Sequence, residues 1–270
     1  MWNYFSNYFN TQSEPVVFKK YGWKPDLPDH RDKMMHFDNE ITSKTPDYVD
    51  LRDKCPPVYD QGALGSCTSQ GIAAAYQFDE MKQNNADEFM PSRLFIYYNE
   101  RKMEGTVKTD SGASIRDGIK SINTTGVCHE TIWPYDIDKF ADEPGTNCYT
   151  DAKTHKSLKY HRVRQSSLQL KAALDAGYPI VFGISVYESF DSQEVANTGI
   201  VPMPKEDEKM LGGHCIVLVG YDNIKKQWIF RNSWGEDWGD KGYGYLPYKY
   251  LNSKCKLASD FWVVETVCSK

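Results

Sequence analysis

The sequence has no cluster of basic residues longer than pairs such as Lys19-Lys20 and Lys225-Lys226. Its 37 acidic residues outnumber its 32 basic ones, which gives a formal net charge of -5. A protein that binds nucleic acid normally presents a basic face. We therefore expect no nucleic-acid partner.

Long apolar runs are also absent. The longest, such as residues 215–219 (CIVLV), fall far short of the roughly 18 residues that a membrane span requires. The mean hydropathy is -0.63. The N-terminus has no Lys or Arg before Lys19 and no aliphatic segment that ends in small residues, so it does not read as a secretory signal peptide. We expect no membrane contact and an intracellular location.

The sequence contains no Cys-x-x-Cys pair, which weakens zinc and thioredoxin-like interpretations, and we expect no metal and no cofactor. Its cysteines number seven, an odd count, so at least one is unpaired within the chain. A chain of 270 residues can bury a core without disulfide or metal support. The spare thiol therefore needs a chemical explanation.

Residues 1–45 differ in pattern from the rest, because aromatic residues crowd the first ten positions and prolines then interrupt any helix. Beyond residue 45, helix patterns come first and strand patterns second, which predicts an α+β fold with two lobes. The expected helices are 67–81, 93–101, 114–122 and 168–176, and the expected strands are 180–186, 215–221, 228–232, 242–246 and 261–267. The helical lobe should cover about 60–150 and the β lobe about 155–267.

Residues 61–67 (QGALGSC) form a glycine-bearing turn that delivers Cys67 to the start of a helix, with Ser66 as a possible N-cap. A helix N-terminus presents free N–H groups and partial positive charge, which favours thiolate over thiol. Cys67 is therefore a candidate nucleophile. Taken alone, a buried core cysteine fits this segment equally well.

Two further segments carry polar groups at the ends of apolar strands. His214 stands at the rim of the strand CIVLV, and Asn232 ends the strand WIFRN, with Trp234 and Trp238 close behind. Each alone fits an ordinary structural residue. Together, Cys67, His214 and Asn232 supply a thiol, a base for its proton, and an acceptor that sets the tautomer of that base.

At this point the sequence resembles the papain-like cysteine peptidases, the cathepsin family. The matching stretches are QGALGSC, GGHCIVLVGYD and RNSWGEDWGDKGYGYLP, with weaker agreement at TPDYVDLRD, GVCHETIWPYD and DFWVVE. The resemblance spans about residues 45–267. It implies a helical lobe, an antiparallel β-barrel-like lobe and a cleft between them. It also implies hydrolysis of peptide bonds through a thiolate–imidazolium pair and a covalent acyl-enzyme.

The resemblance also assigns roles. Cys67 would be the nucleophile, His214 the general base and then acid, and Asn232 the residue that orients His214. Gln61 and the backbone N–H of Cys67 would form the oxyanion hole. Activity would then be highest from mildly acid to neutral pH.

Other residues would support or line the cleft. Trp234 would cover the hydrogen bond between His214 and Asn232 from water. Asp260 would lie near the S2 pocket and accept a basic P2 side chain. The substrate-binding residues implied in this way are Gly65, Gly112, Gly213, Trp238 and Asp260.

The sequence departs from many family members near the nucleophile. Thr68 stands where a tryptophan is common, and Leu64 stands where a disulfide cysteine is common. The segment DSGAS also lacks the cysteine that would close that disulfide. These departures are typical of the branch found in bacteria and large DNA viruses, so the enzyme would be intracellular or packaged in a virion. Pairing among the other six cysteines stays open.

Family zymogens pass an N-terminal propeptide through the cleft, usually backwards. We expect residues 1–45 to be a propeptide-like or regulatory extension, with Tyr4, Tyr8 or Phe9 near Cys67, and residues 46–270 to be the peptidase domain. A permanent structural wrap fits residues 16–45 equally well.

An endopeptidase is the default, because no insertion with paired histidines suggests a dipeptidase loop. Two alternatives stay open: an acyl transferase of transglutaminase or ligase type, and a non-catalytic binding protein on the same fold. The expected partners are protein or peptide substrates and the protein's own N-terminal segment, and we expect a monomer.

Overall fold

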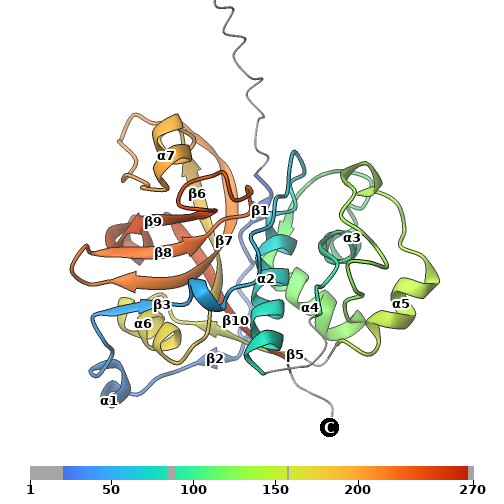
Figure 1. Cartoon of the computed structure of the whole chain (residues 1–270), viewed down its shortest axis with the longest axis horizontal. Coiled ribbons are helices and arrows are strands. Elements are labelled where there is room, and N and C mark those ends of the chain that lie inside the picture. The colour runs from blue at the N-terminus through green and yellow to red at the C-terminus, as the bar shows by residue number, and fades with distance from the viewer. Residues whose placement is uncertain (1–20, 84–88, 157, 267–270) are drawn as a thin grey trace, which may run out of the picture.

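The computed structural model describes residues 21–83, 89–156 and 158–266. The helices within residues 67–152 and the large sheet lie on opposite sides, with the N-terminal segment between them (Figure 1). The predicted two-lobed α+β fold is confirmed. Tyr4, Tyr8 and Phe9, which we expected near Cys67, lie outside the described residues.

In the helical lobe, serine and glycine residues mark where helices begin and end. Ser92 accepts a hydrogen bond from the N–H of Phe95, and Ser114 accepts one from the N–H of Asp117, so each caps the helix after it. At the other end of the first of these helices, Gly105 takes the left-handed conformation with φ 72° that favours glycine. The helices of this lobe are α2 (Cys67–Lys82), α3 (Arg93–Glu104), α4 (Ile115–Thr125) and α5 (Thr146–Ala152).

Helix α2 lies between the sheet and the other helices of its lobe (Figure 1), and its residues from Cys67 to Asp79 are buried. Its polar side chains therefore need partners inside the protein. Thr68 Oγ1 donates to Glu100 Oε1 at 2.6 Å, and Ser69 Oγ donates to the carbonyl of Ser66 at 2.9 Å. These bonds hold the first turn of α2 from inside the lobe.

The β lobe is one mixed sheet in the order β2-β5-β10-β6-β7-β8-β9, with β3 paired to β7. Its strands are β2 (Met34–Met35), β3 (Tyr48–Asp50), β5 (Leu158–Val163), β6 (Ile180–Tyr187), β7 (Met210–Asp222), β8 (Gln227–Arg231), β9 (Tyr243–Pro247) and β10 (Ala258–Thr266). The two-lobed fold agrees with expectation, and the expected antiparallel, barrel-like lobe differs from the structure in two respects. The sheet does not close into a barrel, and β2 joins it in parallel.

Two short helices, α6 (Ser167–Asp175) and α7 (Gln193–Thr198), accompany the sheet. Short 3-10 helices complete the fold at Arg52–Lys54, Ile137–Lys139, Tyr248–Leu251 and Ser253–Cys255. Among the residues described, no helix combines the length and apolar character that crossing a bilayer requires.

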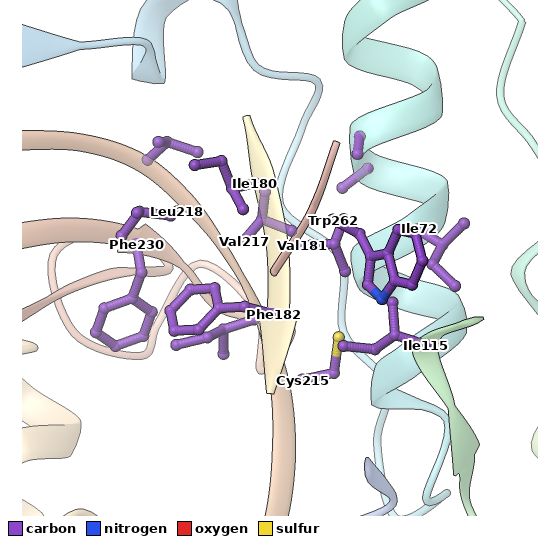
Figure 2. Close-up of a cluster of buried hydrophobic side chains, with 14 of the residues drawn as sticks. Ile72, Ile115, Ile180, Val181, Phe182, Cys215, Val217, Leu218, Phe230 and Trp262 are labelled. Atoms are coloured by element: carbon purple, nitrogen blue, oxygen red, sulfur yellow. The ribbon is translucent and has the colours of Figure 1, made fainter. Parts of the chain in front are cut away.

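The core fills the space between α2 and the sheet. Side chains on β6 and β7 alternate between two faces, as a strand requires. Figure 2 shows Phe182 and Phe230 on one side of β6, with Trp262 and Ile72 on the side that faces α2. Trp262 is fully buried, so replacing it with alanine would cost about 3–5 kcal/mol.

The described N-terminal segment follows the boundary between the two lobes. Its strand β1 (Trp23–Lys24) pairs in parallel with β4 (Ala113–Ser114) of the helical lobe. Strand β2 then pairs with β5 of the sheet, and a short helix, α1 (Asn39–Thr42), follows. The segment therefore contacts both lobes before the main fold begins.

Candidate active site

Cys67 is the first residue of α2, as predicted. Ser66 precedes the helix, but its hydroxyl does not act as the expected side-chain cap. It pairs with the hydroxyl of Tyr135 at 2.5 Å and accepts from Gln70 Nε2 at 3.2 Å. The Ser66 hydroxyl, which the sequence predicted would cap α2, therefore bonds to Tyr135 instead.

His214 lies in β7, and Asn232 directly follows β8, the antiparallel neighbour of β7. His214 Nε2 and Asn232 Oδ1 are 2.8 Å apart. An amide oxygen can only accept, so this bond places a proton on Nε2. The indole of Trp234 stacks on the imidazole, with centroids 4.8 Å apart and planes inclined by 26°.

Gln61 is fully buried and joins the turn before Cys67 to the segment after β8. Its Nε2 donates to the carbonyl of Leu64 at 2.8 Å, and its Oε1 accepts from Ser233 Oγ at 2.7 Å. The backbone N–H of Gln61 also donates to the carbonyl of Ser233 at 2.9 Å. These bonds fix the side-chain amide beside the start of α2.

Cys67 is fully buried, and this burial raises the pKa of its thiol to about 12. Backbone N–H groups of Cys215, Gly22 and Thr68 face the sulfur and act in the opposite direction, whereas a charged Glu100 would raise the pKa further. We expected a helix terminus to make this thiol acidic. In this arrangement the exclusion of water is the larger effect, and the thiol stays protonated.

The N–H of Gly22 faces the sulfur because residues 21–24 occupy the groove above Cys67. Gly22 lies between Gly65 and Gly112, two of the glycines expected to bind substrate backbone. A Cβ on Gly22 would lie 1.8 Å from the carbonyl oxygen of Gly65, and one on Gly112 would lie 1.9 Å from the carbonyl oxygen of Gly22. The Gly22 carbonyl accepts from the N–H of Ala113 at 2.8 Å. These glycines therefore allow an extended chain to lie directly against the groove.

The neighbours of Gly22 fill the rest of this groove. A Cβ on Gly183 would lie 1.9 Å from Cε2 of Trp23, and one on Gly213 would lie 2.4 Å from the Trp23 carbonyl oxygen. Beside Trp23 there is a cavity of about 400 Å³. On the other side, the Tyr21 ring lies 6.2 Å from that of Trp234. The protein's own chain thus occupies the positions around the thiol and imidazole.

Trp238 and Asp260, also expected to bind substrate, are both buried. The Trp238 ring stacks on that of Phe190, with centroids 6.1 Å apart, and meets the Trp234 ring edge-on at 5.5 Å. Trp238 therefore packs against Trp234 and holds it in place. Asp260 Oδ1 accepts from Arg162 at 3.0 Å. A basic substrate side chain would have to compete with this arginine for Asp260.

The sequence interpretation missed Trp23, Gly183 and the buried pair Thr68–Glu100. Gly183 carried a usable signal, because a glycine inside an apolar strand marks a close approach of another chain. The position of Trp23 carried none, since its contacts are with residues far along the chain. The six described cysteines are Cys55, Cys67, Cys128, Cys148, Cys215 and Cys255, and all are free thiols.

A thiol at a helix start, an imidazole bound to an amide oxygen and a cleft between a helical and a β lobe together have the architecture of a cysteine peptidase. The sequence profile described as "Papain family cysteine protease" matches residues 45–264. The chain belongs to the papain family and is a cysteine peptidase.

Individual relatives agree with this assignment. A peptidase C1-like protein of Acanthamoeba polyphaga mimivirus, described as uncharacterized, is 45% identical over 276 residues, or 93% of this chain and 88% of its own. Xylellain, a cysteine protease from Xylella fastidiosa, has 43% identity and a TM-score of 0.85 over 93% of this chain and 97% of its own. Procathepsin L 3 of Tenebrio molitor, 19% identical, covers 93% of this chain and 77% of its own with a TM-score of 0.64, which supports the fold alone.

Proposed function

We propose that the protein is an endopeptidase that cleaves through a covalent acyl-enzyme, and that residues 21–24 hold it inactive until they leave the cleft. The observation that carries the first part is the bond between His214 Nε2 and Asn232 Oδ1, made in the groove that contains Cys67. With Nε2 bound to the amide, Nδ1 is the ring nitrogen that exchanges a proton with the thiol.

In this reaction, Cys67 passes its proton to His214 and its sulfur attacks the carbonyl carbon of the scissile bond. The negative oxygen that forms is stabilised by Gln61 Nε2 and the backbone N–H of Cys67. The C–N bond then breaks as His214 gives its proton to the departing amine. A water molecule, deprotonated by His214, attacks the thioester, releases the acid product and restores the thiol.

The groove supports an extended peptide as the ligand, because it already holds one. At Gly22 the self-segment presents a backbone N–H to the Cys67 sulfur, and this donor lowers the pKa of the thiol. The Gly22 carbonyl is bound to Ala113 instead. This geometry supports an inhibitor that blocks the thiol without being cut.

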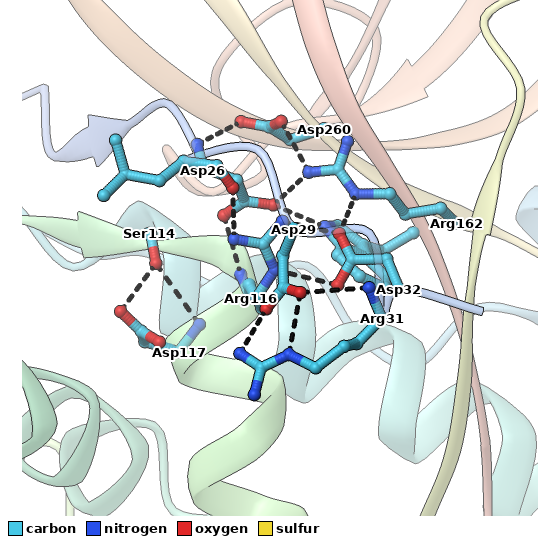
Figure 3. Close-up of polar contacts among 11 residues, drawn as sticks. Asp26, Asp29, Arg31, Asp32, Ser114, Arg116, Asp117, Arg162 and Asp260 are labelled. Atoms are coloured by element: carbon cyan, nitrogen blue, oxygen red, sulfur yellow. Dashed lines mark hydrogen bonds and ion pairs between the residues drawn. The ribbon is translucent and has the colours of Figure 1, made fainter. Parts of the chain in front are cut away.

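We name residues 21–24 the gate and residues 25–45 the wrap, because their contacts differ in kind. The gate lies over the groove. The wrap is anchored in the body of the protein, and Figure 3 shows its Asp26 and Asp32 among Arg116, Arg162 and Asp260. Asp26 accepts from Arg162 at 2.7 Å and from Trp262 Nε1 at 2.8 Å, and its carboxylate is fully buried. Asp32 pairs with Arg116 at 2.5 Å, with both side chains only 8% exposed.

The wrap has further anchors beyond these charges. The backbone N–H and carbonyl of Phe37 bond to the side-chain amide of Gln169 at 2.9 and 2.8 Å. Strand β2 extends the main sheet through its pairing with β5. The two hypotheses for the N-terminal segment therefore apply to different parts of it. We propose that the gate is the regulatory part and that the wrap is a permanent part of the folded peptidase.

The test compares the full chain with chains that begin at Pro25 and at Thr45. We expect the chain from Pro25 to fold and to cleave a fluorogenic peptide faster than the full chain. We expect the chain from Thr45 to lose stability, because Arg116 and Arg162 lose the carboxylates of Asp26 and Asp32. Labelling of Cys67 by an epoxysuccinyl inhibitor, compared with Cys67→Ala, checks the chemistry separately.

The peptidase proposal fails if the chain from Pro25 folds but neither cleaves peptides nor labels at Cys67. The gate proposal alone fails if that chain is active but no more so than the full chain. Product masses measured with and without an added amine separate hydrolysis from acyl transfer.

A further inference from the structure

Glu100 is a buried carboxyl group that the catalytic steps above do not use. It lies on α3 and is fully buried, and its Oε1 accepts from Thr68 Oγ1 at 2.6 Å. Thr68 directly follows the nucleophile in the sequence. The carboxyl group is therefore one residue removed from Cys67 through a single hydrogen bond.

Among the residues that the structure describes, Glu100 forms no hydrogen bond or ion pair with a cation. The neighbouring Arg101 directs its donors elsewhere, to the carbonyls of Tyr97 at 3.0 Å and Val107 at 2.7 Å, among others. Glu100 Oε2 has no hydrogen-bond partner within the described part of the chain. A buried carboxylate with one hydroxyl partner and no counter-charge would be costly, and a neutral acid costs far less.

The packing around Oε2 leaves no room for an added side chain. A Cβ on Gly118 of α4 would lie 2.5 Å from Oε2 and 2.4 Å from Ile72. The charged groups that act on Glu100 are Glu104 on its own helix, Asp117 on α4 and Arg101. Burial raises the pKa of Glu100 well above its ordinary value, with Glu104 and Asp117 adding to this and Thr68 and Arg101 opposing it.

We infer that Glu100 is a positioning residue of the active site: as a neutral carboxylic acid it holds Thr68 and the first turn of α2 without placing a negative charge beside the thiolate. Thr68 is well placed to transmit this effect, because its N–H faces the Cys67 sulfur. A charged Glu100 would oppose ionisation of Cys67. This inference rests on the proposed function, in which Cys67 reacts as a thiolate.

The first test asks whether Glu100 is neutral, and it uses the full chain. The infrared difference spectrum between wild type and Glu100→Gln at neutral pH should contain the carbonyl band of a protonated carboxylic acid. The matched control, Glu143→Gln, changes an exposed glutamate of the same lobe and should show carboxylate bands. Carboxylate bands in the Glu100 difference would overturn the inference. This measurement is independent of whether the protein cleaves peptides.

The second test asks whether Glu100 matters to Cys67, from the pH dependence of kcat/KM and of Cys67 alkylation by iodoacetamide. Glu100→Gln should keep the acid limb of wild type, because one neutral group replaces another. If Glu100 is ionised, the substitution should instead move that limb down by about one pH unit, which would overturn the inference.

Thr68→Val removes the hydroxyl and leaves the carboxyl group in place. We expect kcat/KM to fall about tenfold or more, with Thr68→Ser restoring most of it. Unchanged kinetics in Thr68→Val would overturn the positioning role. This pair of variants carries the test even if Glu100→Gln fails to fold. A wild-type chain that cleaves no peptide in any state would count against the proposed function, while the infrared result would still decide the charge of Glu100.

Discussion

The indole of Trp23 lies against the backbone of Gly183, so closely that a Cβ on this glycine would overlap the ring. The contact joins the gate to β6 of the sheet, although 160 residues separate the two in sequence. Trp23 is buried and is part of the hydrophobic core. It should therefore determine how firmly the gate stays closed.

Trp23→Ala should open the cleft. Replacing a buried tryptophan with alanine costs about 3–5 kcal/mol. Part of this cost destabilises the closed state relative to the open one, because Trp23 makes its groove contacts only when the gate is closed. We expect the variant to cleave a fluorogenic peptide at least tenfold faster than wild type, measured on the full chain. Leu27→Ala, at a side chain that is 80% exposed, is the control and should leave the rate unchanged. Equal rates for wild type and Trp23→Ala would contradict the proposed gate.

The pH dependence of Cys67 should report the state of the gate. Burial raises the pKa of this thiol from 9.0 to about 12 when the gate is closed. Because the closed state holds the proton, alkylation by iodoacetamide should be slow at neutral pH and should rise about tenfold per pH unit as the pH approaches about 12. In Trp23→Ala the profile should move to lower pH, since water and the helix terminus can then stabilise the thiolate. Mass spectrometry of the labelled peptide provides the measurement, and identical profiles would count against this account.

Asn232→Ala should impair catalysis without preventing folding. It removes the acceptor of the His214 bond, which becomes charge-assisted when the imidazole is protonated and is then worth about 1.5–3 kcal/mol. We expect kcat/KM to fall about tenfold or more, and less than the ~10²–10⁴-fold loss expected for His214→Ala. Trp234→Phe keeps an aromatic ring over the bond and should have the smaller effect. An Asn232→Ala enzyme with wild-type kcat/KM would exclude the orienting role.

Arg116→Ala should destabilise the fold through the wrap. The substitution leaves Asp32 with Arg162 as its remaining ion-pair partner in the described chain and removes the donor to the Leu27 carbonyl. Breaking a buried pair in this way costs about 3–5 kcal/mol. Lys44→Ala is the matched control, because its partner Glu40 is 79% exposed, and it should cost only about 0.3–0.5 kcal/mol. Urea unfolding in a Cys67→Ala background, where self-cleavage is impossible, distinguishes the two. Similar losses for both variants would mean that the wrap contributes little to stability.

The parts of the molecule that were predictable from sequence depend on short-range pattern. The helix after Cys67, the strand after His214 and the strand before Asn232 all follow from local spacing and from motifs of a few residues. The parts that were not predictable depend on contacts between distant segments. The hydroxyl of Ser66 was expected to cap α2 and instead binds Tyr135, and β2 has only two residues, too few to show a strand pattern. The occupation of the cleft by residues 21–24 was likewise not predictable, because it depends on contacts with residues far along the chain.

The covalent link between the gate and the anchored wrap determines how inhibition responds to concentration. A tethered segment meets its site at an effective concentration set by the tether, on the order of millimolar for a short flexible linker, however dilute the protein is. Dilution cannot therefore activate the enzyme, and a substrate must compete with a neighbour that never diffuses away. One cut between Lys24 and Pro25 would turn the gate into a free peptide. Inhibition would then become dependent on concentration and would be lost on dilution.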